Sequence, residues 1–207
     1  MVGIPEIVSY PLPDRMTLPG NVARWELRPE RSVLLIHDMQ RYFVNLLPDP
    51  LRTALVDNTA LLRKRCAALG LPVAYTAQPG RMSEQERGLL MDIWGPGMKT
   101  DAAHQEIVSE VAPADGDWVF TKWRYSAFFR SDLLARIRQT GRDQLILCGV
   151  YAHVGVLATA LDAFTNDIQP FVVADAVGDF SARQHELALQ FMAQRCGVVL
   201  PLEDVLP

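Results

Sequence analysis

The sequence predicts an α/β protein of three layers, in which helices cover both faces of a parallel sheet of about six strands. Short apolar runs alternate with amphipathic helical segments along the chain, and each right-handed crossover of such a chain must cover the sheet that it leaves. The length of 207 residues and the hydrophobic content of 49% suit a single core. We therefore expect one domain at residues 31–207, preceded by an extended arm at residues 1–30.

The arm is expected from its prolines, which recur with acidic residues between them and lack the basic-then-apolar plan of a signal peptide. The first strand is the apolar run at 32–38. A helix is expected at 51–69, because apolar residues there recur at helical spacing and basic residues supply a solvated face. A short strand follows at 71–77, and a third, buried strand at 118–122.

The second half of the chain continues the alternation. A helix is expected at 131–141, where glycine ends it. Residues 145–164 have the length of a membrane span, but glycines and polar residues interrupt them, so a buried strand running into a buried helix is favoured. Another strand is expected at 170–175. A helix then begins at Ser181, which has the spacing of a capping box, and the last strand lies at 197–200.

Polar residues stand where three of the expected strands end. Asp38, Lys122 and Tyr151 follow the first, third and fourth strands. In an open parallel sheet, a ligand binds outside the carboxyl ends of the strands, where the strand order reverses. We therefore expect these three residues to converge, and an acid beside an amine suits proton transfer. Glycine-rich phosphate-binding fingerprints are absent from the sequence.

Three motifs resemble the isochorismatase-like hydrolase superfamily, and the resemblance extends over essentially the whole chain. They are His37-Asp38-Met39-Gln40, Thr121-Lys122-Trp123-Arg124-Tyr125-Ser126-Ala127-Phe128 and Gly149-Val150-Tyr151-Ala152-His153-Val154-Gly155. The resemblance implies the Rossmann-like topology of that superfamily, a cis peptide bond between Val150 and Tyr151, and a homodimer.

Many members of the superfamily are amidases that use an Asp, a Lys and a nucleophilic cysteine six residues after the glycine that corresponds to Gly149. This sequence has Gly155 at the position of the cysteine, which closes the route through an acyl-enzyme. Members with this glycine are isochorismatases, which hydrolyse the vinyl ether of an enolpyruvyl group. The chain most resembles the phenazine-pathway members of this subgroup.

The resemblance implies hydrolysis of 2-amino-2-deoxyisochorismate to pyruvate and 2,3-dihydro-3-hydroxyanthranilic acid. The alternative substrate is isochorismate, which would give 2,3-dihydro-2,3-dihydroxybenzoate for siderophore synthesis. Asp38 would protonate the terminal methylene carbon and water would capture the oxocarbenium ion. A neighbouring Lys122 favours the carboxylate form of Asp38, so we expect the carboxylates of the substrate to help Asp38 hold its proton. A cysteine-type amidase and an inactive scaffold are the competing functions; Gly155 argues against the first, and the retained Asp38 and Lys122 argue against the second.

Further site residues follow from the same resemblance. Those expected to hold polar groups of the substrate are Gln78, Arg87 and Lys122. Those expected to line the pocket are Phe43, Trp94, Tyr125 and Tyr151, with Gly155 leaving space and an amide N–H near the enolpyruvyl group. Each also has a plainer interpretation: Lys122 could extend to solvent from a strand end, Arg87 could lie on a solvated helix face, and the aromatic residues could belong to the core.

Charge and cysteine content limit the function classes. A net charge of −4 without a basic run argues against a nucleic-acid partner, and no membrane association is expected. Three cysteines lie far apart in apolar stretches, which predicts neither a disulfide framework nor a zinc site and indicates a reduced, cytoplasmic protein. The expected partner is a small chorismate-derived substrate.

The histidines do not suggest a metal site. His37 neighbours Asp38 in a strand and is expected to point to the other face, and residues 45–60 contain no histidine. We therefore expect no metal and no cofactor. His153 is expected to be structural, and His104 and His185 are expected on helix surfaces. Asp175 and Asp179 are expected to brace the loop before Ser181.

Overall fold

The computed structural model describes residues 3–99 and 102–206, which contain a six-stranded parallel sheet. The strand order is β3-β2-β1-β4-β5-β6, which confirms the predicted fold class. The strands are β1 (Ser32–His37), β2 (Val73–Ala77), β3 (Trp118–Thr121), β4 (Gln144–Val150), β5 (Gln169–Gly178) and β6 (Val198–Leu200). Residues 1–2 and 207 of the expected arm and domain lie outside the described residues.

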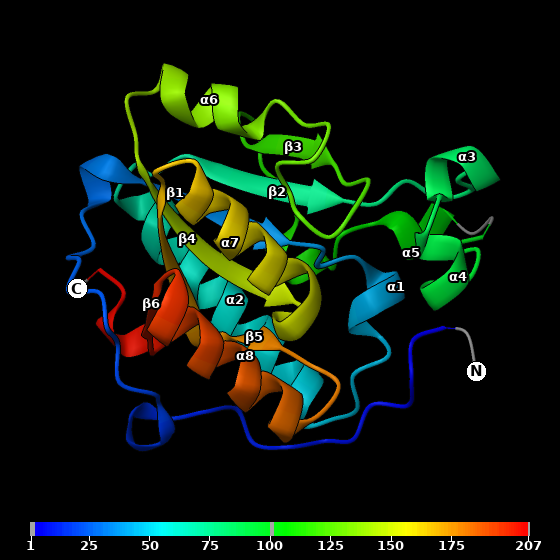
Figure 1. Cartoon of the computed structure of the whole chain (residues 1–207), viewed down its shortest axis with the longest axis horizontal. Helices are drawn as coiled ribbons and strands as arrows, with labels where there is room; N and C mark the ends of the chain where they lie inside the picture. The colour runs from blue at the N-terminus through cyan, green and yellow to red at the C-terminus, as the bar shows by residue number, and fades with distance from the viewer. Residues whose placement is uncertain (1–2, 100–101, 207) are drawn as a thin grey trace.

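Helices cover both faces of the sheet (Figure 1). One face carries α2 (Leu51–Ala68), and the other carries α6 (Leu133–Gln139), α7 (Leu157–Thr165) and α8 (Ala182–Arg195). Four shorter helices lie beyond the carboxyl ends of the strands: α1 (Arg41–Val44), α3 (Glu84–Arg87), α4 (Leu90–Trp94) and α5 (Ala102–Gln105).

The central strand β1 contributes to two cores, because successive side chains of a strand point to opposite faces. Leu34 and Ile36 pack into the core that contains the buried residues of α2. Val33 and Leu35 pack into the core beneath α6, α7 and α8. All four side chains are fully buried, as a parallel strand covered on both faces requires.

Two strands differ from the prediction. β3 was expected to be buried, but it lies at the edge of the sheet and alternates half-buried with exposed residues; Val119 is 56% exposed. An edge strand has a neighbour on one side only, so less of it is covered. β5 continues to Gly178, past the expected end at residue 175, because Ala176 and Val177 extend its buried run.

The predicted helix boundaries are largely confirmed. Ser181 caps α8, since its Oγ accepts a hydrogen bond from the Gln184 N–H at 3.3 Å. Gly141 follows α6 with a φ of +69°, the left-handed conformation that commonly ends a helix. Residues 145–164 form most of β4, a π-helical turn at Ala152–Val156 and most of α7, as expected. No helix in the described part of the chain is both long and apolar enough to cross a membrane.

The N-terminal segment lies against α8 and the loop before it (Figure 1). Residues 3–28 contain a 3-10 turn at Arg15–Thr17 and otherwise neither helix nor strand. The Val8 N–H donates to the Phe180 carbonyl at 3.4 Å. Tyr10 packs edge-on against His185, with ring centroids 5.6 Å apart. His185 is therefore buried, at 1% exposure, and the prediction of a surface position was wrong because the segment covers that helix face.

The strand order places a crevice between β1 and β4. Counted along the sheet, the chain proceeds outward in opposite directions from these two neighbouring strands. The connections that follow them leave toward opposite faces, which opens a crevice at their carboxyl ends. Asp38 directly follows β1 and Tyr151 directly follows β4, so both stand at this crevice.

Candidate active site

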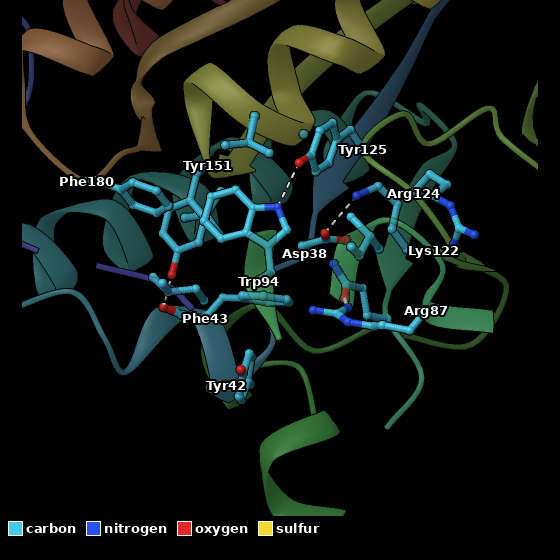
Figure 2. A pocket seen from close by; sticks show the side chains of 16 residues that line it. Asp38, Tyr42, Phe43, Arg87, Trp94, Lys122, Arg124, Tyr125, Tyr151 and Phe180 are labelled. Atoms are coloured by element: carbon cyan, nitrogen blue, oxygen red, sulfur yellow. Dashed lines mark hydrogen bonds and ion pairs between the residues drawn. The ribbon is translucent and has the colours of Figure 1, made fainter. Parts of the chain in front are cut away.

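Asp38 is the carboxylate at the centre of the crevice (Figure 2). Its Oδ1 accepts a hydrogen bond from the Thr76 hydroxyl at 2.6 Å, and its Oδ2 accepts one from Lys122 Nζ at 2.9 Å. The Asp38 N–H also donates to Thr76 Oγ1 at 3.1 Å. Asp38 and Lys122 are 4% and 2% exposed. The two form a buried ion pair, so the interpretation of Lys122 as a residue extending to solvent is excluded.

Lys122 reaches Asp38 from the edge of the sheet. Its backbone N–H continues the pairing of β3 with β2 by donating to the Ala77 carbonyl at 2.9 Å. β2 lies between β3 and β1, so the two strand ends are roughly 10 Å apart at a strand spacing of about 4.8 Å. A long side chain is needed to cross the end of β2, and lysine supplies it.

The surroundings of Asp38 favour its charged form. Burial opposes ionisation, but the positive charge of Lys122 and the hydrogen bonds from Thr76 and Lys122 outweigh it, so the pKa of Asp38 lies below its ordinary value. Without a ligand, Asp38 is therefore a carboxylate paired with Lys122. A role as proton donor requires a bound group that weakens this pairing.

His37 lies closer to Asp38 than strand alternation predicts. Its Nδ1 is 3.8 Å from Asp38 Oδ2 and 2.8 Å from the Val150 carbonyl oxygen. Alternation ends at this point because Asp38 has a φ of +50°, which lies outside the β region. The expectation that His37 points away from Asp38 was wrong. Among the described residues, no three His, Cys, Asp or Glu side chains are grouped so that they could hold a metal ion.

Gln78 and Arg87 form a polar wall of the pocket. The Gln40 side chain holds the backbone of Gln78 from both sides, accepting from its N–H at 2.7 Å and donating to its carbonyl at 2.9 Å. Arg87 is only 5% exposed, so it does not lie on a solvated helix face. Its Nε donates to the Gly95 carbonyl at 2.7 Å and its Nη1 to Gln78 Oε1 at 3.4 Å.

Arg87 has no salt bridge to a carboxylate among the described residues. Burial lowers the pKa of its guanidinium, with a smaller contribution from the nearby Arg124. A buried cation without an anion is costly, and a ligand carboxylate would offset that cost. The geometry therefore suits an anionic ligand.

The predicted aromatic residues form the opposite wall. The Tyr151 hydroxyl donates to the Phe43 carbonyl at 2.9 Å, and the two rings pack edge-to-face. Trp94 Nε1 donates to the Tyr125 hydroxyl at 2.8 Å across the pocket (Figure 2). All nine predicted site residues thus line one pocket: Asp38, Phe43, Gln78, Arg87, Trp94, Lys122, Tyr125, Tyr151 and Gly155.

Comparison with known proteins agrees with this geometry. The model of the isochorismatase domain matches residues 32–204. Phenazine biosynthesis protein PhzD1 of Pseudomonas aeruginosa is 60% identical over 206 residues, covering 100% of both chains. The chain belongs to the isochorismatase family. Enterobactin synthase component B of Escherichia coli is 45% identical over 208 residues, covering 100% of this chain and 73% of that protein.

Solved structures show the same fold. N-carbamoylsarcosine amidase from Thermoplasma acidophilum has a TM-score of 0.73 at 26% identity, covering 86% of this chain and 99% of that chain. A cysteine hydrolase from Pseudomonas syringae pv. phaseolicola has a TM-score of 0.79 at 21% identity, covering 96% of both chains. These matches show the fold, and the family model with the sequence relatives makes the chain an isochorismatase-type hydrolase.

Two further expectations for this isochorismatase-family chain concern its backbone and its thiols. The peptide bond between Val150 and Tyr151 is cis, as predicted. Cys66, Cys148 and Cys196 are free and buried, and none of them lines the pocket. The pocket therefore presents Gly155, and no thiol, beside Asp38.

The structure adds pocket residues that the sequence reasoning missed. They are Ile4, Tyr42, Leu90, Arg124, Val150, Val154 and Phe180, with Thr76 behind Asp38. Arg124 stands within one of the recognised motifs, so its position after Lys122 was an available signal. Thr76 pairs with His37 in the parallel register of β1 and β2, and that register is visible only once the strand order is known.

Asp179 holds the turn that follows β4. It accepts hydrogen bonds from the His153 N–H at 2.8 Å, from the His153 ring and from the Phe180 N–H at 2.8 Å. Phe180 is thereby placed 4.5 Å from the Tyr151 ring, measured between centroids. Asp175 instead accepts from the Leu202 N–H at 2.7 Å, so the expectation that it braces the loop before Ser181 was wrong.

Proposed function

We propose that this chain hydrolyses the vinyl ether of 2-amino-2-deoxyisochorismate, giving pyruvate and 2,3-dihydro-3-hydroxyanthranilic acid for phenazine-type secondary metabolism. The observation that carries the proposal is the buried pair of Asp38 and Lys122 beside Gly155. The 60% identity to a relative named as a phenazine biosynthesis protein, over the whole of both chains, supports the choice of pathway.

In the proposed reaction, the Asp38 carboxyl transfers its proton to the terminal methylene carbon of the enolpyruvyl group. The carbon that bears the ether oxygen becomes an oxocarbenium ion, and water adds to it while Asp38 takes up a proton from that water. The resulting hemiketal breaks its bond to the ring oxygen and releases pyruvate and the ring alcohol. No side chain forms a covalent bond, so glycine at position 155 is compatible with every step.

In the proposed reaction, the bound substrate raises the pKa of Asp38 from the low value that it has without a ligand. Lys122 holds Asp38 ionised when the pocket contains no anion. A dicarboxylate bound between Lys122 and Arg87 adds negative charge near Asp38 and competes for the lysine, and both effects raise the pKa of the acid. We propose that Gln78 and Arg87 hold substrate carboxylate or ring oxygens, while Phe43, Trp94, Tyr125 and Tyr151 enclose the ring.

Isochorismate is the second candidate substrate, and the residues that line the pocket support it. Asp38 is the only carboxylate among the described residues that line the pocket. A ring ammonium group therefore meets no second acid that would select it over a hydroxyl group. The relative named enterobactin synthase component B, at 45% identity over the whole of this chain, supports this alternative.

The deciding experiment measures pyruvate release from each purified substrate with a lactate dehydrogenase assay. We expect turnover of both, with kcat/KM for the two within about tenfold, since one substituent without a dedicated partner separates them by about 1.4 kcal/mol or less. Absence of pyruvate from both would reject the proposal. Ammonia release from nicotinamide would instead support an amidase.

We further propose a cytoplasmic homodimer in which residues 1–30 form an arm on the hydrolase domain of residues 31–207. The three free, buried cysteines support a reducing compartment. The contacts of Val8 and Tyr10 with the region around α8 support the assignment of the arm. Light scattering of the purified protein measures the oligomeric state.

A further inference from the structure

The ring of His37 lies directly beneath Gly155 at the floor of the pocket. A β-carbon on residue 155 would lie 2.3 Å from His37 Cε1, 3.0 Å from Nε2 and 3.2 Å from Nδ1. Cε1 therefore stands where a side chain would begin, and the two ring nitrogens would make tight contacts with it. Protein interiors are close-packed, so such an overlap requires the ring to move.

The ring of His37 is held in place by the backbone. Its side chain is fully buried, and Nδ1 lies 2.8 Å from the Val150 carbonyl oxygen. Since a carbonyl oxygen only accepts hydrogen bonds, Nδ1 carries a proton and donates it. Turning the ring away would leave the buried Val150 carbonyl without this donor, which is unfavourable.

The ring is also uncharged near neutral pH. Burial, followed by the positive charge of Lys122, lowers the pKa of His37 to about 4. Asp38 and the backbone of Val150 and Tyr125 act in the opposite direction without restoring the charge. His37 therefore fills space next to Asp38 without adding a second cation to the pair with Lys122.

We infer that His37 is a positioning residue that prevents a side chain at position 155 from occupying the floor of the pocket. Its ring fills the volume that a side chain at position 155 would need, so backbone alone faces the substrate at that point beside Asp38. The inference rests on the proposed function only for the identity of the substrate. Gly155 and His37 together exclude covalent attack from position 155, so a change at Gly155 alone cannot restore it.

A double-mutant cycle on stability tests the inference. Gly155→Ala is expected to lower Tm by about 5 °C, because the new methyl group overlaps the His37 ring, which its hydrogen bond to the Val150 carbonyl holds in place. In the His37→Ala background the same change is expected to cause little further loss, because the ring is gone. The inference is wrong if Gly155→Ala lowers Tm by the same amount in the His37→Ala background as in the parent protein.

Gly197→Ala is the matched control for the cycle. Its β-carbon would also make a tight contact, 3.0 Å from the Pro170 carbonyl oxygen, but that contact does not involve His37. Its effect on Tm is expected to be the same in both backgrounds. A loss that also disappears with His37→Ala would show that the ring acts through general destabilisation, which contradicts the inference.

A thiol at position 155 gives a second readout. Gly155→Cys is combined with His37 or with His37→Ala, and each protein is treated with iodoacetamide and mapped by mass spectrometry. With His37→Ala, only the introduced thiol is expected to react, because Cys66, Cys148 and Cys196 are buried. With His37 present, the misfit is expected to expose the native cysteines as well.

Selective labelling of a stable Gly155→Cys protein that retains His37 would overturn the inference. Neither readout depends on turnover. Failure of the proposed substrate assay and failure of this inference are therefore visible separately.

Discussion

Asp38 combines three properties that few residues can share. Its φ of +50° is disfavoured for most side chains but tolerated by Asp and Asn. Its carboxylate is buried, and Lys122 and Thr76 occupy its two oxygens. The position therefore constrains both the backbone and the charge. Comparing two substitutions at Asp38 separates the effect of removing the acid from the effect of disturbing the fold.

Asp38→Asn is expected to lower kcat by at least about 10³ while KM changes little, since a general acid typically contributes about 10²–10⁴ in rate. Asn retains the shape and tolerates the backbone conformation. Asp38→Ala is expected to lose as much activity and also about 3–5 kcal/mol of stability, because Lys122 stays buried without its partner. Steady-state kinetics and urea unfolding measure the two effects.

Asp143→Asn is the matched control for this prediction. Asp143 pairs with Arg31 at 2.7 Å near the surface, and exposed pairs contribute at most about 1 kcal/mol. Its kcat is expected to equal that of the parent protein. Near-normal turnover of Asp38→Asn would remove Asp38 from the role of proton donor.

At the scale of elements, the pocket is assembled by connections rather than by the sheet itself. The loop after β5 delivers Phe180, the turn after β4 delivers Tyr151, and Asp179 ties that loop to the turn. The N-terminal segment fastens the same loop, because the Tyr10 hydroxyl accepts from the Asp179 N–H at 2.7 Å. One wall of the pocket thus depends on a segment about 170 residues away in sequence.

Tyr10→Phe is expected to destabilise the protein by about 1–3 kcal/mol, because the buried Asp179 N–H and His185 Nδ1 lose their partner. Urea unfolding measures this loss. Met16→Ala, at an 89% exposed position of the same segment, is expected to change stability by less than about 0.5 kcal/mol. Equal stability of Tyr10→Phe and the parent protein would show that this hydroxyl does not hold the loop.

At the scale of the whole molecule, two histidines of the described chain, His37 and His185, are buried without charge. Burial is the main cause that lowers the pKa of His37 and of His185 to about 4. In the unfolded chain both titrate near 6.5. Between these values the unfolded chain binds more protons than the folded protein, so acid favours unfolding in that interval.

Stability is therefore expected to be highest above about pH 6.5 and to decline as the pH falls toward about 4. Each histidine contributes up to about 3 kcal/mol to this decline. Below about pH 4 the two histidines contribute no further change. Asp38, with its lowered pKa, adds a loss of stability only where the pH falls through that still lower value.

The urea midpoint measured from pH 4 to 8 checks this expectation. His185→Gln is expected to flatten the decline, whereas His104→Gln, at an exposed helix position, is expected to leave it unchanged. A flat curve for the parent protein would contradict the assignment of His37 and His185 as buried neutral groups.

Local sequence determined the elements and the chemistry. Apolar periodicity located the six strands and the long helices, because each period reports which faces an element buries. The motifs after three of these strands contain five of the nine predicted residues that line the pocket, and the resemblance to the family supplied the other four, Phe43, Gln78, Arg87 and Trp94. Gly155 excludes a nucleophilic side chain at that position, and a missing side chain is visible in the sequence itself.

Tertiary structure alone decided the order of the strands and every contact that depends on it. It placed β3 at the edge, so that Lys122 crosses the end of β2 to reach Asp38, and it paired Thr76 with the same carboxylate. It also buried His185 under Tyr10 and set His37 beneath Gly155. The physical reason is that hydrophobic periodicity reports which faces of an element are buried. These contacts instead join segments that come close only when the two cores pack together.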